Sequence, residues 1–75
     1  MEKLKMKTKE PIAVKHVTAF YSVMIYDIDE NECKALTRCT NDPRMVWCTI
    51  FYTSYGEAYI RKHGQRHYLD EFIRV

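Results

Sequence analysis

The sequence predicts one small α+β domain, with an antiparallel sheet of three or four strands, one short helix and a C-terminal helical turn. Alternation of apolar and polar residues between positions 12 and 28 is typical of a strand. Residues 45–53 are rich in β-branched and aromatic side chains, which also favours a strand. Residues 30–39 carry apolar residues at helical spacing. With 75 residues in the chain, only one core is expected.

Four segments are predicted to form the sheet: residues 14–26, 45–53, 58–63 and 66–69. The first is long for one strand, so we expect a bulge or a break near Lys15 and His16. The segment 45–53 holds Trp47, the only tryptophan, and has apolar residues on both alternating faces. A strand of that kind is expected in the middle of a sheet or between two layers.

The helix is predicted over residues 30–39. Asp29 is its expected N-cap, with Glu32 three residues later in a variant of the capping box. Cys33, Leu36 and Cys39 form its apolar stripe. The alternative is a strand over 33–39, because Ala35, Thr37 and Cys39 also alternate with Lys34, Leu36 and Arg38. In that case the domain would be a small all-β barrel.

The C-terminal third allows two interpretations. Ser54 with Glu57 fits a capping box and Gly64 fits a C-terminal cap, which together indicate a helix over 55–63. Gly56 would fall in its first turn, however, and residues 58–63 alternate as in a strand. We therefore favour a hairpin that turns at His63-Gly64-Gln65. A helical turn at 70–74 is expected to follow, with Leu69, Phe72 and Ile73 closing the core.

The charge is small overall and unevenly placed. The formal net charge is +2, with basic ends and an acidic middle. Residues 1–10 are a basic arm with lysines at positions 3, 5, 7 and 9, expected as a solvated terminus, an edge strand or a phosphate-binding segment. Residues 11–75 form the domain. No apolar stretch is long enough to span a membrane, and no signal peptide is recognised. The three cysteines are expected to be reduced and the protein cytoplasmic.

Motifs for metals, cofactors and catalysis are incomplete. The candidate zinc ligands are Cys33, Cys39, Cys48, His63 and His67. The two histidines have zinc-finger spacing, but the gaps of five and eight residues between the cysteines do not fit such a site. Asp27, Asp29 and Asn31 match only the start of a calcium loop. No glycine-rich phosphate loop and no local nucleophile motif occurs. The sequence therefore predicts no metal, no cofactor and no enzymatic activity.

Binding is the remaining class of function. The C-terminal third interleaves tyrosines with basic residues, and the predicted partner-binding set is Tyr55, Tyr59, Arg61, Lys62, Arg66 and Tyr68. Tyr and Arg dominate protein–protein hot spots, so the first expectation is a protein-binding module such as an inhibitor or adaptor. The alternative is nucleic-acid binding through the basic arm and a Tyr/Arg sheet face. An open sheet edge would also permit a homodimer.

Overall fold

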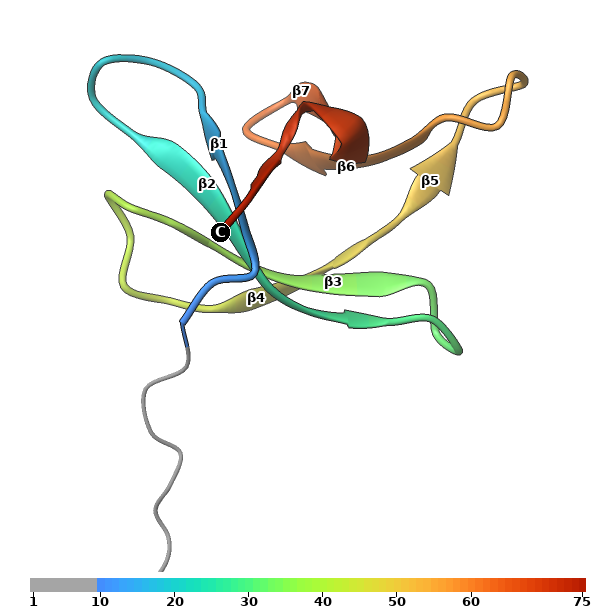
Figure 1. Ribbon diagram of the computed structural model, residues 1–75, viewed down its shortest axis with the longest axis horizontal. Helices are drawn as coiled ribbons and strands as arrows, with labels where there is room; N and C mark the ends of the chain where they lie inside the picture. Colours follow the sequence, from blue (N-terminus) through green and yellow to red (C-terminus); the bar gives the residue numbers. More distant parts are fainter. Residues whose placement is uncertain (1–9) are drawn as a thin grey trace, which may run out of the picture.

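The computed structural model describes residues 10–75, which fold into two antiparallel sheets (Figure 1). The larger sheet has the strand order β4-β3-β2-β1-β8 and the smaller has β5-β6-β7. The elements are β1 (Ala13–His16), β2 (Ser22–Asp29), β3 (Lys34–Cys39), β4 (Val46–Thr49), β5 (Phe51–Tyr52), β6 (Ala58–Lys62), β7 (Gln65–Tyr68), the 3-10 helix η2 (Leu69–Glu71) and β8 (Ile73–Arg74). This part of the chain contains neither an α-helix nor a closed barrel, so the α+β prediction is wrong and the barrel alternative is not supported.

The predicted helix over 30–39 is wrong because its second half is β3. Ala35, Thr37 and Cys39 are each at most 3% exposed, so every second residue is buried, as in a strand, and the helical spacing of the apolar residues does not decide the structure. The predicted capping by Asp29 occurs in a turn instead: Asp29 Oδ1 accepts hydrogen bonds from the backbone N–H of Asn31 and Glu32 at 3.0 and 3.1 Å. Cys33 completes this β2–β3 turn with a φ of 55°. The acids therefore end a strand and start a hairpin.

The predicted strand 14–26 is divided into β1 and β2. The break lies at residues 17–21, and not at Lys15 and His16, which belong to β1. An irregularity in the β2–β3 register occurs between Ile25 and Asp27. The chain therefore forms a β1–β2 hairpin whose loop extends from one corner of the molecule (Figure 1).

The segment 45–53 leaves one sheet and enters the other. Ile50, 8% exposed, separates β4 from β5 at the point of passage. β4 is an edge strand of the larger sheet, and Trp47 is 47% exposed there. The expectation that this segment is central and buried is therefore wrong. Its apolar residues belong first to the larger sheet, in β4, and then to the smaller one, in β5, which explains why both alternating faces are apolar.

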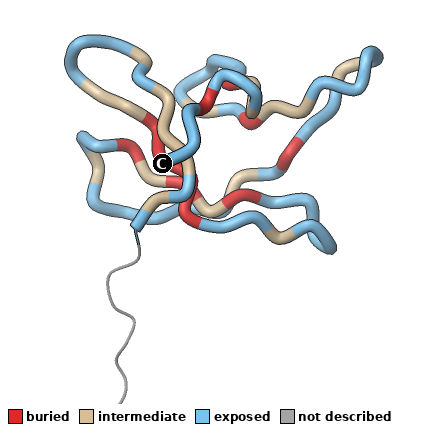
Figure 2. Tube along the Cα trace, in the orientation of Figure 1, coloured by how far each residue is buried: buried red, intermediate tan, exposed pale blue. Residues whose placement is uncertain are grey.

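The core lies between the two sheets (Figure 2). Val23, Ile25 and Ala35 enter it from the larger sheet and Ile60 from the smaller one. Phe72, which follows η2, is 8% exposed and closes the core as predicted.

The chain ends beside β1. The predicted β6–β7 hairpin is confirmed, with its turn at His63 and Gly64. The expected turn at 70–74 is a 3-10 helix one residue earlier, followed by β8, which pairs with β1. Ile73 lies on β8 and is 65% exposed, so it does not close the core. The basic arm lies outside the described residues, apart from Glu10.

Candidate functional site

The smaller sheet presents one face to solvent, which we call the outer face. Its side chains alternate with those that enter the core, because neighbouring residues of a strand point to opposite sides. Cross-strand pairing joins Phe51 to Tyr59, Tyr59 to Tyr68, and Arg61 to Arg66. Ile60 and His67 also pair, on the opposite and buried side. The outer face comprises Phe51, Glu57, Tyr59, Arg61, Arg66 and Tyr68.

Three aromatic rings form a row across the three strands of this face. The ring centroids of Phe51 and Tyr59 are 5.6 Å apart with 28° between the planes, and those of Tyr59 and Tyr68 are 5.5 Å apart with 53°. Each ring comes from a different strand. Phe51 is 42% exposed, and Tyr59 and Tyr68 are partly exposed. The row is therefore an aromatic surface accessible from solvent.

Arginines lie on the same face as the rings. The guanidinium carbon of Arg66 lies 4.5 Å from the centroid of the Tyr59 ring, and Nη1 of Arg66 donates to the Tyr68 hydroxyl at 3.3 Å. The hydrogen bond to Tyr68 and the nearby Tyr59 raise the pKa of Arg66 above its ordinary value. Arg61 is paired with Arg66 and exposed. Two cations thus extend the aromatic row.

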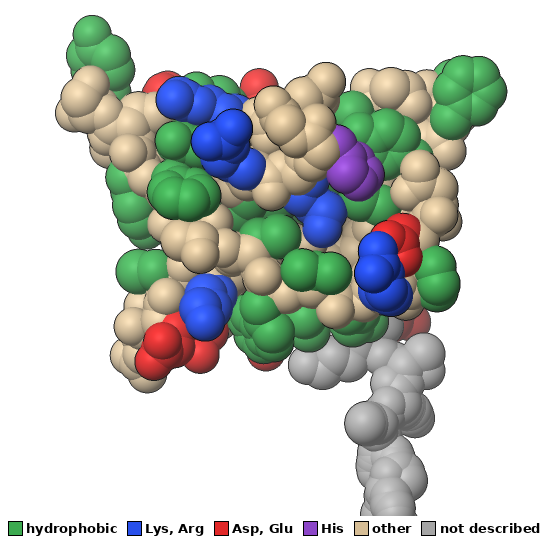
Figure 3. Space-filling view, turned by 180° about the vertical axis from the view of Figure 1, so that it is seen from behind, with side chains coloured by type: hydrophobic (Ala, Val, Ile, Leu, Met, Phe, Trp, Pro, Cys, Tyr) green, Lys and Arg blue, Asp and Glu red, His purple; other side chains and the backbone are tan. Residues whose placement is uncertain are grey.

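Charged side chains of both signs lie on the face shown in Figure 3. Lys and Arg side chains lie over the β6–β7 hairpin, and at the β2–β3 turn Asp and Glu side chains lie next to a basic one. Asp27 and Asp29 at the end of β2, and Glu30 in the turn after it, border a hollow next to Trp47. The acids at this turn would repel an anionic ligand, whereas Arg61 and Arg66 of the outer face would attract one.

A hollow of about 460 Å³ lies at the end of the outer face nearest the β5–β6 turn. It is lined by Tyr52, Thr53, Ser54, Tyr55, Glu57, Tyr59, Arg66 and Tyr68. Thr53 Oγ1 shapes the turn by accepting hydrogen bonds from the backbone N–H of Tyr55 and Glu57 at 3.2 and 3.1 Å. Gly56 supplies a φ of 85°. Tyr55 is 90% exposed at the tip.

The structure brings together most of the residues selected from the sequence. Tyr59, Arg61, Arg66 and Tyr68 share the outer face, and Tyr55 borders the hollow beside them. Lys62 does not join them, because it lies on the inner face. Its Nζ donates to Thr37 Oγ1 at 3.0 Å and thereby links the two sheets.

Two residues of the outer face were not selected from the sequence. Glu57 lies two positions before Tyr59, so the alternation of that strand could have indicated it. Phe51 joins the row through the β5–β6 register, which no sequence signal reveals.

A second cluster joins β1, β7 and η2. Lys15 Nζ lies 3.0 Å from His67 Nδ1 and donates to Glu71 Oε1 at 2.7 Å. An ammonium group has no lone pair, so Nδ1 is the acceptor and the imidazole is neutral, with its proton on Nε2. His67 is 1% exposed, and Nε2 has no partner among the described residues. Burial, and then the charge of Lys15, lower the pKa of His67. This cluster, buried at His67 and exposed at Glu71, holds elements of the fold together.

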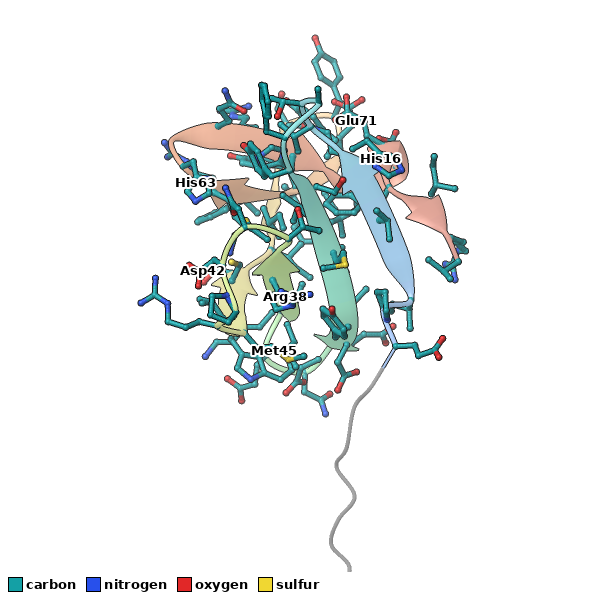
Figure 4. The ribbon with its side chains drawn as sticks, turned by 90° about the vertical axis from the view of Figure 1, so that its left-hand side faces the viewer. His16, Arg38, Asp42, Met45, His63 and Glu71 are labelled. Carbon is teal, nitrogen blue, oxygen red and sulfur yellow. The ribbon has the colours of Figure 1, made fainter. Side chains whose placement is uncertain are left out.

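The two histidines considered for zinc lie in different environments. His63 is exposed at the β6–β7 turn, whereas His67 is buried. Figure 4 shows that His63 lies at a distance from Glu71, which is beside β1. Among residues 10–75, no group of three or more His, Cys, Asp or Glu side chains is arranged to hold a metal ion. All three cysteines are free, and burial raises the pKa of the Cys39 thiol. Within the same residues, no helix is long and apolar enough to cross a membrane.

Comparison with known protein families, with curated proteins and with solved structures found no match to this chain. Any function must therefore be argued from the site itself.

Proposed function

We propose that the protein is a non-enzymatic binding module that holds single-stranded nucleic acid on the outer face of the smaller sheet. The observation that carries the proposal is the row of Phe51, Tyr59 and Tyr68 across three neighbouring strands, with Arg61 and Arg66 on the same face. Single-strand binders combine aromatic rings, on which bases stack, with cations that follow the phosphates. A sheet that carries such rings stacks two or three bases.

The arrangement changes the order of the two expectations from the sequence, which placed a protein partner first. Tyr and Arg also serve protein interfaces, but those interfaces have a largely apolar centre that is depleted in charge. None of the six outer-face residues is aliphatic, and three of them, Glu57, Arg61 and Arg66, are charged. An apolar exposed edge, formed by Met45 and by Val46 and Trp47 of β4, lies in the other sheet. Binding of a protein instead of nucleic acid is therefore kept as an alternative result of the test.

The test is the affinity of the full chain for a fluorescently labelled single-stranded oligonucleotide, measured by anisotropy. Tyr59→Leu preserves apolar packing but removes the stacking surface, and we expect it to cost about 1–3 kcal/mol of binding free energy. Phe20→Leu is the matched control, because Phe20 is 90% exposed in the β1–β2 loop. Thermal unfolding of both variants checks that each is folded.

Salt dependence tests the role of the arginines. Each phosphate contact contributes about 0.7 to the slope of log affinity against log salt for single strands. Arg61→Met should lower that slope by about this amount. Arg44→Met should not, because Arg44 lies in the β3–β4 loop and pairs with Asp42. Two results would refute the proposal. One is an oligonucleotide affinity that Tyr59→Leu leaves unchanged. The other is a chain that has no oligonucleotide affinity and instead captures from lysate a protein that stays bound after nuclease treatment and at high salt.

A further inference from the structure

The hollow beside the β5–β6 turn contains a carboxylate that a simple phosphate-binding surface would not need. Glu57 repels phosphates, yet it lines the hollow together with Tyr59 and Arg66. Neither ion pair found within residues 10–75 includes Glu57. Its two oxygens are therefore available as hydrogen-bond acceptors, and a ligand that uses them must present donors.

The acid and the arginine are positioned around the same ring. Glu57 lies two residues before Tyr59 along the chain, about 7 Å at the rise of an extended strand. Arg66 pairs with Arg61, on the other side of Tyr59, and its guanidinium reaches back over the Tyr59 ring. Arg66 uses Nη1 to donate to Tyr68, which leaves other N–H groups of its guanidinium to donate to a ligand. The hollow thus brings aromatic rings together with the carboxylate of Glu57, which accepts, and the guanidinium of Arg66, which donates.

We infer that this hollow binds a guanine base of the single strand, an inference that rests on the proposed function. Guanine has two adjacent donors, N1–H and N2–H2, which match the two oxygens of a carboxylate. Its O6 and N7 are acceptors, and arginine is the usual donor to that pair. Adenine and cytosine each place a ring-nitrogen acceptor beside their amino group, so they repel one carboxylate oxygen. Thymine and uracil offer one N–H between two carbonyls. Only guanine satisfies both side chains.

The inference is tested with three short thymidine oligonucleotides that differ at one central base: guanine, inosine or adenine. Guanine should bind about tenfold more tightly than adenine, as one bidentate base contact provides. Inosine lacks the N2 amino group and should fall between them. Glu57→Gln should abolish most of the difference between guanine and adenine while the oligonucleotides still bind. Glu30→Gln, an exposed acid at the β2–β3 turn, is the control and should leave the preference unchanged.

The outcomes separate the inference from the function on which it rests. Equal affinity for the three oligonucleotides, with binding that still depends on Tyr59, would overturn the guanine inference and leave the proposed function intact. A guanine preference that survives in the Glu57→Gln variant would also overturn it. No binding of any oligonucleotide would refute both.

Discussion

The burial of a neutral His67 predicts a loss of stability in mildly acidic solution. Burial and the charge of Lys15 lower the pKa of His67, and His63 acts in the same direction. Glu71 and the nearby backbone of Lys62 oppose the change without reversing it. The unfolded imidazole gains its proton near about pH 6.5, whereas the folded one does so only at lower pH. The contribution is therefore fully present above that pH and lost as the pH falls below it.

The loss in the free energy of unfolding is limited by the uptake of one proton by His67. Between pH 7.5 and pH 5.5 a single histidine that stays neutral in the folded protein lowers the free energy of unfolding by at most about 1.4 kcal/mol. Glu71 and Asp42 contribute little in this window, because Lys15 lowers the pKa of Glu71 and Arg44 lowers that of Asp42 to about 2.

The assay is urea unfolding at the two pH values. The wild-type protein should lose stability on acidification, and His67→Met should lose much less because its side chain does not titrate. His67→Gln serves the same purpose if the Met variant does not fold. His16→Gln is the control, because His16 is exposed at the end of β1 and is not among the groups that act on His67, and it should keep the wild-type loss. The same loss in the wild type and in a His67 variant would refute the reasoning.

Three further predictions concern the packing of the smaller sheet, each measured by urea unfolding. Ile60→Ala should cost about 2–5 kcal/mol, because Ile60 is 0% exposed in the core; a cost below 1 kcal/mol would place it outside the core. Lys62→Met should cost on the order of 1–3 kcal/mol by removing the bond to Thr37, yet leave oligonucleotide affinity unchanged. A loss of affinity with stability retained would instead assign Lys62 to the binding surface. Gly64→Ala should cost about 1 kcal/mol, because its φ of 75° disfavours a Cβ although no atom lies within 4 Å of one; a neutral effect would contradict that turn.

The sequence indicates those strands in which apolar and polar residues alternate. Residues 58–63 and 66–69 were recognised because Gly64 supplies a turn between two alternating segments. The helix at 30–39 was a wrong choice between two periods that fit equally well over so short a segment. The sheet decided it, because Ala35, Thr37 and Cys39 are buried only when β3 lies between β2 and β4.

Pairing between distant segments limited what could be predicted of the site. Tyr59, Arg61, Arg66 and Tyr68 lie in one hairpin, so their common face follows from local alternation. Phe51 belongs to the site only because β5 pairs with β6, after the chain has passed from one sheet to the other at Ile50. The segment 45–53 was expected to be buried because its two apolar faces suggested one layer on each side. Its two halves belong to different sheets, and that division depends on tertiary structure.

The most direct test of the central claim is a map of the bound surface in solution. Backbone amide signals of isotopically labelled protein are recorded by NMR while an unlabelled thymidine oligonucleotide with one central guanine is added. We expect the largest shifts on the outer face of the smaller sheet, at Phe51, Tyr59, Arg61, Arg66 and Tyr68, with little change along the β4 edge. Shifts confined to the β4 edge, or no shifts at oligonucleotide concentrations well above that of the protein, would contradict the account.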